Sequence, residues 1–424
     1  MIDTWRCSIE LDPRILYRLA NHHGSSLECL YFEMLGNGQE LGYDISTFSK
    51  FCSLKTLRWG RVRSAKDMPA LMRILKTSAA SLRTLSLDYD SLGINTHLDD
   101  NEVLKDCDTD DIKLWHITEY QTPMRGIGPR MVNPLIPLSQ IQRLRLTHPR
   151  FKVDVASLGP TTTENLLHFD RLVEFEINHI RNVPADIKAG IFRHGETLKI
   201  LFICGATVES FCKTFSAAEL LELGHRCPNL VELAISQNFR IPTHKRTHPG
   251  SLFHTLTEFP LHVFRNLELL FLSIPFTGNE PLLDDGYFKN DAFGQSGVMR
   301  TLLETMLNGN RDLPQPGNYE SITAVPPEPS DKLKIVGMGI GSPEWALHIY
   351  AQGAHTPRLW RARHPSADDG PITLSLANFE DVMDRDPGWK LLRRYHLLLP
   401  NEGLRGIFRQ PHLPPSSEFI SARN

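Results

Sequence analysis

The stretch that decides the fold is CPNLVELAIS, residues 227–236, in which apolar side chains occupy positions 230, 233 and 235. The same spacing, L-x-x-L-x-L, recurs along the chain when any bulky apolar residue is accepted at the three anchor positions. Ten hexamers match, and they start at Leu27, Leu54, Leu82, Ile112, Ile141, Leu172, Leu198, Leu230, Leu267 and Leu333. The first eight starts lie 26 to 32 residues apart by subtraction. Because chance matches would not keep so regular an interval, the pattern indicates an internal repeat.

The segments between the hexamers carry helix signals. Residues 67–76 begin with Asp67 as an expected cap and have Pro69 in the first turn. Residues 216–226 open with Ser216 and Glu219, the spacing of a capping box. Two further segments with helical spacing are 184–195 and 296–309. Each unit is therefore predicted to contain a short strand, a turn and a helix.

A single unit of this kind buries too little apolar surface to offset the conformational entropy that it loses on folding. Neighbouring units must therefore share one core, with strands side by side and helices on the outside. The predicted fold is an α/β solenoid with a curved, mostly parallel inner sheet and outer helices.

The repeat resembles a leucine-rich repeat, with lengths near and slightly beyond the upper end of that family's range. CPNL at 227–230, with FCSL at 51–54 as a looser match, is similar to the cysteine-containing subtype of F-box/leucine-rich-repeat proteins. The insertion-rich layout is most similar to the predicted F-box proteins of filamentous fungi. The resemblance covers roughly residues 10 to 340 and departs from the consensus at the ninth-position Asn, which only Asn238 supplies in place. It implies non-catalytic protein recognition, as in the substrate-recognition part of an F-box ubiquitin-ligase receptor.

Residues 11–20, LDPRILYRLA, weakly match the phrase that opens an F-box. Since Leu27 already begins a repeat, the more economical interpretation is the helix of the first repeat. The F-box is thus expected to be missing from this chain, and a cullin-ligase adaptor is an expected partner only if an F-box lies upstream. An orphan structural or scaffold repeat protein with no ligase role is the alternative.

The regions of the chain are defined by where the repeat interval is kept and where it is lost. We expect a leucine-rich-repeat solenoid over 1–341, irregular insertions at 237–262 and 274–332, a helical cap over 342–400 with helices at 342–352 and 376–399, and a disordered tail over 401–424.

Composition restricts the class of partner. Lys+Arg number 46 against 49 Asp+Glu, a formal net charge of -3, which argues against a nucleic-acid partner held by phosphate attraction. The sequence has no apolar run long enough to cross a bilayer and no apolar signal core at its start, so no membrane partner is expected. Seven scattered cysteines favour reduced thiols, and hence a cytoplasmic or nuclear location.

Motifs that suggest chemistry have simpler interpretations. IVGMGIGSP, 335–343, has G-x-G-x-G spacing and no P-loop accompanies it, which favours a tight turn at a strand end. His244, His248 and His254 lie in a Pro-containing stretch that favours a solvated loop. Cys204 and Cys212 are too far apart for a C-x-x-C site. We therefore predict no enzyme, no cofactor and no metal; an enzyme with a site in 340–424 is the least favoured alternative.

The candidate binding residues are those that strand alternation directs to the inner, concave face. They are Tyr31, Arg58, Arg61, Tyr89, His116, Arg145, His148, Glu176, His179, Phe202 and Phe271. The expected surface has a basic first half with Arg58, Arg61 and Arg145, and an apolar second half that grips a protein partner. The alternative is that long side chains cover one another, or that C-terminal helices fold back over Phe271.

Overall fold

The computed structural model describes residues 4–10, 13–33, 45–62, 64–89, 112–123, 135–147, 169–180, 185–205, 215–236, 260–274, 332–340, 358–364 and 372–377, with the single residues 166, 183, 300, 303, 304 and 307.

The described strands are β1 Thr4–Glu10, β2 Cys29–Glu33, β3 Thr56–Val62, β4 Thr84–Tyr89, β5 Glu119–Pro123, β6 Arg143–Thr147, β7 Glu174–Ile180, β8 Ile200–Gly205, β9 Glu232–Ser236, β10 Leu269–Ile274, β11 Ile335–Ile340, β12 Arg358–Arg363 and β13 Thr373–Ala377. The helices are α1 Pro13–His23, α2 Ser64–Ser78, α5 Ala185–Arg193 and α6 Ala217–Arg226, with short 3₁₀ turns η1 Ile45–Lys50, η5 Leu138–Gln140 and η7 Leu261–Val263.

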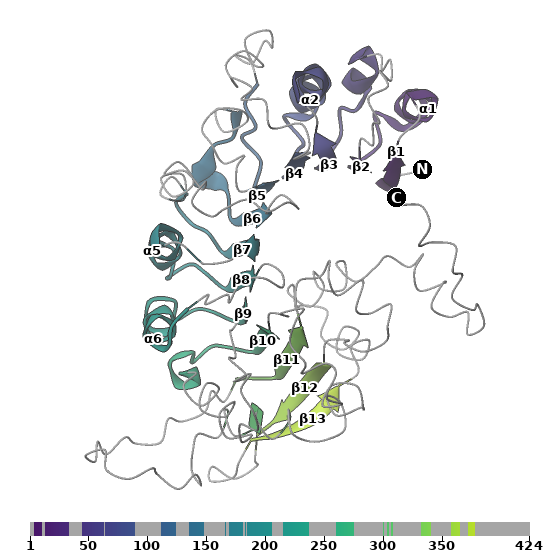
Figure 1. Cartoon of the computed structure of the whole chain (residues 1–424). Helices are drawn as coiled ribbons and strands as arrows, with labels where there is room; N and C mark the ends of the chain where they lie inside the picture. Colours follow the sequence, from purple (N-terminus) through teal and green to yellow (C-terminus); the bar gives the residue numbers. More distant parts are fainter. Residues whose placement is uncertain are drawn as a thin grey trace, which may run out of the picture.

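All described strands belong to one sheet, and they follow one another in chain order. From β1 to β11 neighbouring strands are parallel, whereas β12 and β13 are antiparallel to their neighbours. Figure 1 shows the strands along an open arc, with α1, α2, α5 and α6 on its outer side. This α/β arrangement is consistent with a repeat solenoid, because each parallel step needs a crossover that the outer segments provide.

The main core lies between the sheet and the outer helices. The anchor side chains of successive strands point into it, for example Leu57, Leu85 and Leu144. Near the start of the sheet, aromatic rings fill the space: the ring centroid of Trp59 lies 4.5 Å from that of Phe32. One continuous core of this kind explains why the units fold together.

The outer helices largely confirm the sequence prediction. α5 and α6 lie within the predicted segments 184–195 and 216–226. α2 begins at Ser64, before the expected cap at Asp67. In segment 296–309 only residues 300, 303, 304 and 307 are described, and they are helical.

The start of the repeat array was only partly predicted. α1 connects β1 to β2, in the position of a repeat helix. β1 precedes Leu27 and was not anticipated, because its sequence, TWRCSIE, lacks the hexamer pattern.

The fourth hexamer, which starts at Ile112, was predicted in the wrong register. Its strand is β5, which begins after Ile117, not the segment that begins at Ile112. The Thr118 carbonyl accepts the backbone N–H groups of Gln142 and Arg143, as the Arg83 carbonyl accepts those of Thr118 and Glu119. Ile112 and Leu114 are buried, but in the loop before the strand. Buried apolar residues of this loop therefore produced a false match to the strand pattern.

The C-terminal segment differs from the expected helical cap. Residues 358–363 and 373–377 are strands, and Trp360 is buried in the main core while Leu359 is buried on the opposite face. The helices expected at 342–352 and 376–399 lie outside the described residues, except that Leu376 and Ala377 belong to β13. Most of the insertions at 237–262 and 274–332 and all of the tail at 401–424 also lie outside them.

Candidate functional site

The inner face of the sheet carries two rows of side chains, because parallel strands stay in register from one unit to the next. The first row from β2 to β11 contains Cys29, Thr56, Thr84, Glu119, Arg143, Glu174, Ile200, Glu232, Leu269 and Ile335. The second contains Tyr31, Arg58, Ser86, Gln121, Arg145, Glu176, Phe202, Ala234, Phe271 and Gly337. Six predicted site residues thus lie in one row: Tyr31, Arg58, Arg145, Glu176, Phe202 and Phe271.

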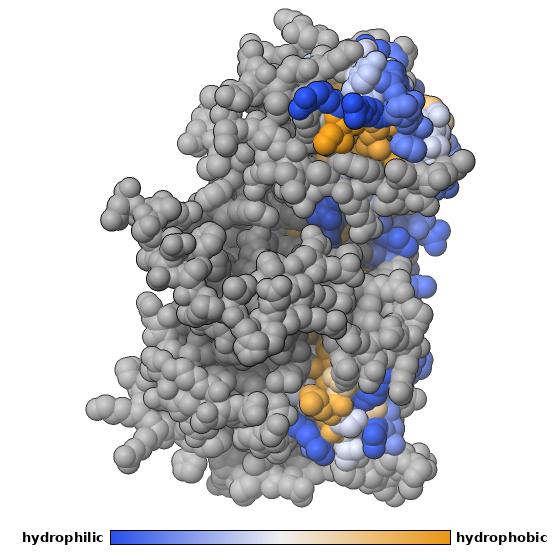
Figure 2. Space-filling view, turned by 90° about the vertical axis from the view of Figure 1, so that its right-hand side faces the viewer, coloured by the Kyte–Doolittle hydropathy of each residue, from blue (hydrophilic) through white to orange (hydrophobic). Residues whose placement is uncertain are grey.

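The accessibility of these rows changes abruptly between β6 and β7. On β2 to β6 the row residues are partly or fully accessible, with Ser86 as the exception. On β7 to β11 every row residue is buried. Figure 2, seen from the side to which the arc opens, shows mainly hydrophilic atoms among the described residues, with hydrophobic atoms gathered in the upper and the lower part of the view. The inner face therefore has an accessible first half, formed by β2 to β6.

The buried second half contains its own apolar cluster. Its members are Ile200, Phe202, Ala234, Leu269, Phe271, Ile335 and Leu359. Phe202 and Phe271 are each 1% exposed, so the prediction that they face solvent was wrong. A Cβ on Gly337 would lie 2.4 Å from Cδ2 of Phe271 and 2.9 Å from Cδ2 of Leu359. The phenyl ring thus occupies space that a side chain at 337 would need.

The covering of Phe271 agrees in part with the first alternative, and the helices of the second lie outside the described residues. Inner-face side chains do cover one another, as the first alternative proposed, because Phe271 packs with Leu269 and Ile335. The C-terminal residue that joins them is Leu359, which belongs to strand β12 instead of a helix.

A ladder of ion pairs forms the boundary between the two halves. Arg143 Nε lies 3.0 Å from Glu174 Oε1, and Arg143 Nη1 lies 3.4 Å from Glu119 Oε2. Arg145 Nε lies 2.6 Å from Glu176 Oε2. The side chains of Glu174 and Glu176 are each 1% exposed. The first half is thus less basic than predicted, since the charge of Arg145 is balanced by a carboxylate of β7.

Arg145 also donates from Nη1 to Oε1 of Gln121, at 3.4 Å. An ion pair and a hydrogen bond from one guanidinium to the two neighbouring strands restrict its orientation. The accessible face therefore presents an arginine whose conformation is set before any partner arrives.

The remaining predicted residues are less well placed. His116 is exposed in the loop before β5, so its assignment to the inner face was wrong. Arg61, Tyr89 and His179 belong to β3, β4 and β7, but their side chains are not among those described. His148 lies outside the described residues.

Sequence reasoning missed several residues of the ladder. Gln121 was missed because of the register error at Ile112. Arg143 and Glu174 were missed although alternation marks them, since each directly precedes the second anchor of its hexamer and points to the same side as Arg145 and Glu176. A systematic use of period two would have found both.

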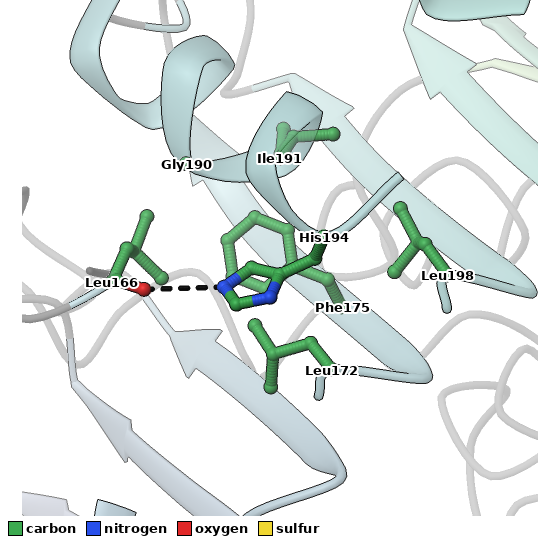
Figure 3. A pocket seen from close by; sticks show the side chains of 7 residues that line it. All are labelled: Leu166, Leu172, Phe175, Gly190, Ile191, His194 and Leu198. Carbon is green, nitrogen blue, oxygen red and sulfur yellow. Dashed lines mark hydrogen bonds between the residues drawn. The ribbon is translucent and has the colours of Figure 1, made fainter. Parts of the chain in front are cut away.

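A narrow crevice on the outer side of the sheet holds a buried histidine. The lining residues are Leu166, Leu172, Phe175, Gly190, Ile191, His194 and Leu198. Figure 3 shows the His194 ring among these apolar side chains, with Nε2 directed at the Leu166 carbonyl. Burial lowers the pKa of His194 below its ordinary value of 6.5.

The described thiols differ in their burial. Cys227 is buried, and burial raises the pKa of its thiol to about 12, so it carries no nucleophilic thiolate at neutral pH. Within the described ranges no three His, Cys, Asp or Glu side chains gather as metal ligands. None of the helices described here has the length and apolar character needed to span a bilayer.

Comparison of the sequence with models of known protein families gives no match, and comparison with curated proteins gives none either. The function must therefore be inferred from the geometry of the inner face.

Proposed function

We propose that this chain is a non-catalytic recognition protein of the leucine-rich-repeat type, and that its protein partner binds the inner face of β2 to β6. The observation that carries the proposal is the abrupt change in accessibility: inner-face side chains are accessible before β7 and buried from β7 to β11. A long concave surface assembled from successive repeats is the usual binding surface of a solenoid.

The leucine-rich-repeat assignment is supported by recurring contacts at the start of the strands. The Lys55 carbonyl accepts the backbone N–H groups of Arg83 and Thr84, and the same pair of bonds recurs at the Lys199 carbonyl. The residue before the first anchor often binds the preceding unit as well. Ser81 Oγ donates to the Leu54 carbonyl at 2.8 Å, and Asn229 Nδ2 donates to the Glu196 carbonyl at 2.8 Å.

The accessible half has the chemistry of a protein-binding surface. Tyr31 and Arg58 are neighbours across β2 and β3, and Arg58 is exposed. Tyrosine and arginine are enriched among residues that dominate binding energy at protein interfaces. Arg145 is already oriented by Glu176 and Gln121, which reduces the entropy that binding would cost.

The resemblance to F-box/leucine-rich-repeat proteins suggests substrate selection for ubiquitination as the biological role, in the cytoplasm or nucleus. That role requires an F-box to dock the cullin-ligase adaptor, and an in-frame F-box exon upstream of Met1 would supply one. Recognition by the inner face does not depend on it.

The test is a pair of matched charge reversals in one repeat. Arg58→Glu changes the inner face at β3, whereas Arg73→Glu changes the exposed outer side of α2 in the same unit. Partners captured by the wild-type chain in cells are identified, purified and titrated against all three proteins. Arg58→Glu is expected to weaken binding by about tenfold or more, while Arg73→Glu leaves it unchanged. Equal affinities for the wild type and Arg58→Glu, with both folded, would contradict inner-face recognition.

A further inference from the structure

The backbone that carries the His194 side chain is held by the turn that follows α5. The His194 carbonyl accepts the backbone N–H groups of Thr197 and Leu198, each at 2.9 Å. Thr197 Oγ1 also donates to the Leu172 carbonyl at 2.8 Å, which attaches this turn to the preceding unit. These bonds hold the backbone that carries the imidazole.

The hydrogen bonding of the ring determines its protonation state. Nε2 lies 3.2 Å from the Leu166 carbonyl oxygen, which can only accept, so Nε2 carries the proton. Nδ1 is buried and has no hydrogen-bond partner. The residue is 3% exposed, and the crevice walls are apolar. A second proton on Nδ1 would create a buried charge with an unsatisfied donor, which is strongly unfavourable.

Two charged side chains act on the ring, and they oppose each other. Arg193, at the end of α5, disfavours the imidazolium, whereas Asp170, in the segment before β7, favours it. The other described side chains that line the crevice are apolar. Burial is the dominant effect, and it favours the neutral ring.

Strand β7 connects this crevice to the inner face. Phe175 lines the crevice on the core side of β7. Its neighbours Glu174 and Glu176 point to the other side, where they hold Arg143 and Arg145. Phe175 and the two carboxylates that order the accessible half thus share one short stretch of β7.

We propose that His194 is an acid-sensitive contact between α5 and β7. Protonation of Nδ1 expels the imidazole from the crevice, separates α5 from β7 and loosens the ion pairs that Glu174 and Glu176 make on the inner face. The consequence for partner binding rests on the proposed function, whereas the opening itself does not.

The direction of the pH effect follows from the linkage between protonation and opening. The pKa of His194 is lower in the closed state than its ordinary value of 6.5, so the open state binds the proton more tightly. The contact is at full strength above pH 6.5 and weakens as the pH falls below it. One pH unit below 6.5, the equilibrium for opening rises by at most about tenfold.

Hydrogen–deuterium exchange of the full chain at pH 7.5 and 5.5, corrected for the intrinsic rate, tests this without any partner. Peptides from α5 and β7 are expected to exchange faster at pH 5.5, by at most about tenfold, while α2 keeps its protection. His194→Gln retains a donor for the Leu166 carbonyl but does not titrate, so its α5 and β7 peptides should lose the pH response. His22→Gln, an exposed position on α1, should keep the wild-type response.

Three results would overturn the proposal: no acceleration in the wild type, equal acceleration in α2 and α5, or an unchanged response in His194→Gln. If His194→Gln fails to fold, the comparison of α5 with α2 in the wild type still decides the matter. Failure of inner-face recognition would leave these exchange rates unaffected, so the two proposals are tested separately.

Discussion

Arg145 and Glu176 face each other across β6 and β7, and they differ sharply in their contact with solvent. The arginine side chain is 22% exposed, whereas the carboxylate is 1% exposed. A buried carboxylate is tolerated only when it is paired, because desolvation of the charge is costly. At the scale of single residues, Glu176 is therefore the inner-face side chain whose burial depends on its ion pair with Arg145.

Arg145→Met is therefore expected to lower the free energy of unfolding by about 3 kcal/mol, because it leaves the Glu176 carboxylate buried without its guanidinium. Urea denaturation at pH 7.5 measures the change. The matched control is Lys55→Met, which breaks the ion pair with Glu28, whose side chains are 57% and 44% exposed. Exposed pairs contribute less than about 1 kcal/mol. Similar losses in both variants would show that burial of Glu176 does not set the cost.

The sequence predicted which of these residues lie in the inner row, but not whether each one is exposed or buried. Alternation from the hexamer placed Arg58, Arg145 and Phe271 in one row, and the strand register confirms that placement. Whether Phe271 faces solvent depends on Gly337 and Leu359, which lie 66 and 88 residues away by subtraction. No local pattern contains that information.

Among the elements, α6 is the clearest example of a helix start fixed by local sequence. Ser216 Oγ accepts the Glu219 backbone N–H, and the Glu219 carboxylate accepts the Ser216 N–H at 2.7 Å. Glu219 also accepts from Lys188 Nζ of α5 at 2.6 Å, so one carboxylate caps α6 and binds the neighbouring helix. Partial burial raises the pKa of Glu219, but these hydrogen bonds outweigh it and leave the pKa below 4.5.

Ser216→Ala is expected to destabilise the chain by about 1 kcal/mol, because one backbone N–H at the start of α6 loses its acceptor. Ser216→Asp supplies another acceptor and should restore most of this loss. Urea denaturation measures both at pH 7.5. An equal loss in both variants would mean that the hydroxyl contributes through something other than capping.

Strand β13, the last strand of the described sheet, makes a contact that the pattern of its own residues does not predict. Glu304 Oε1 accepts the backbone N–H of Leu374 at 2.7 Å, and Arg300 Nε lies 2.9 Å from the same oxygen. A donor of strand β13 is thus satisfied by a side chain from a distant segment, which reduces the tendency of an edge strand to pair with another chain. The sequence of β13 alone, TLSLA, gave no sign of this contact.

Over the whole molecule, one core extends from α1 to β13, and its C-terminal end depends on β12. Trp360 joins the main core, while Leu359 joins the inner apolar cluster. Removal of β12 exposes apolar side chains on both faces of β11 at once.

A chain that ends at residue 341 is therefore expected to unfold at a lower urea concentration and to bind a hydrophobic dye. A chain that ends at residue 400 retains β12 and β13 and should behave like the full chain. Intrinsic fluorescence during urea denaturation and dye fluorescence in buffer measure the two effects. If the chain ending at 341 matches the full chain in both measurements, β12 does not close the core.

The sequence alone determined that the chain repeats and, for the parallel strands other than β1 and β5, which residues share a row, because the backbone period and the apolar spacing are local properties. It also determined the start of α6, since the capping box of Ser216 and Glu219 acts within a few residues. Only the tertiary structure decided which half of the inner face is accessible, which arginines are neutralised and that strands occur near the C-terminus. Those outcomes depend on contacts between segments far apart in the chain, where burial and charge pairing depend on the neighbour that folding supplies.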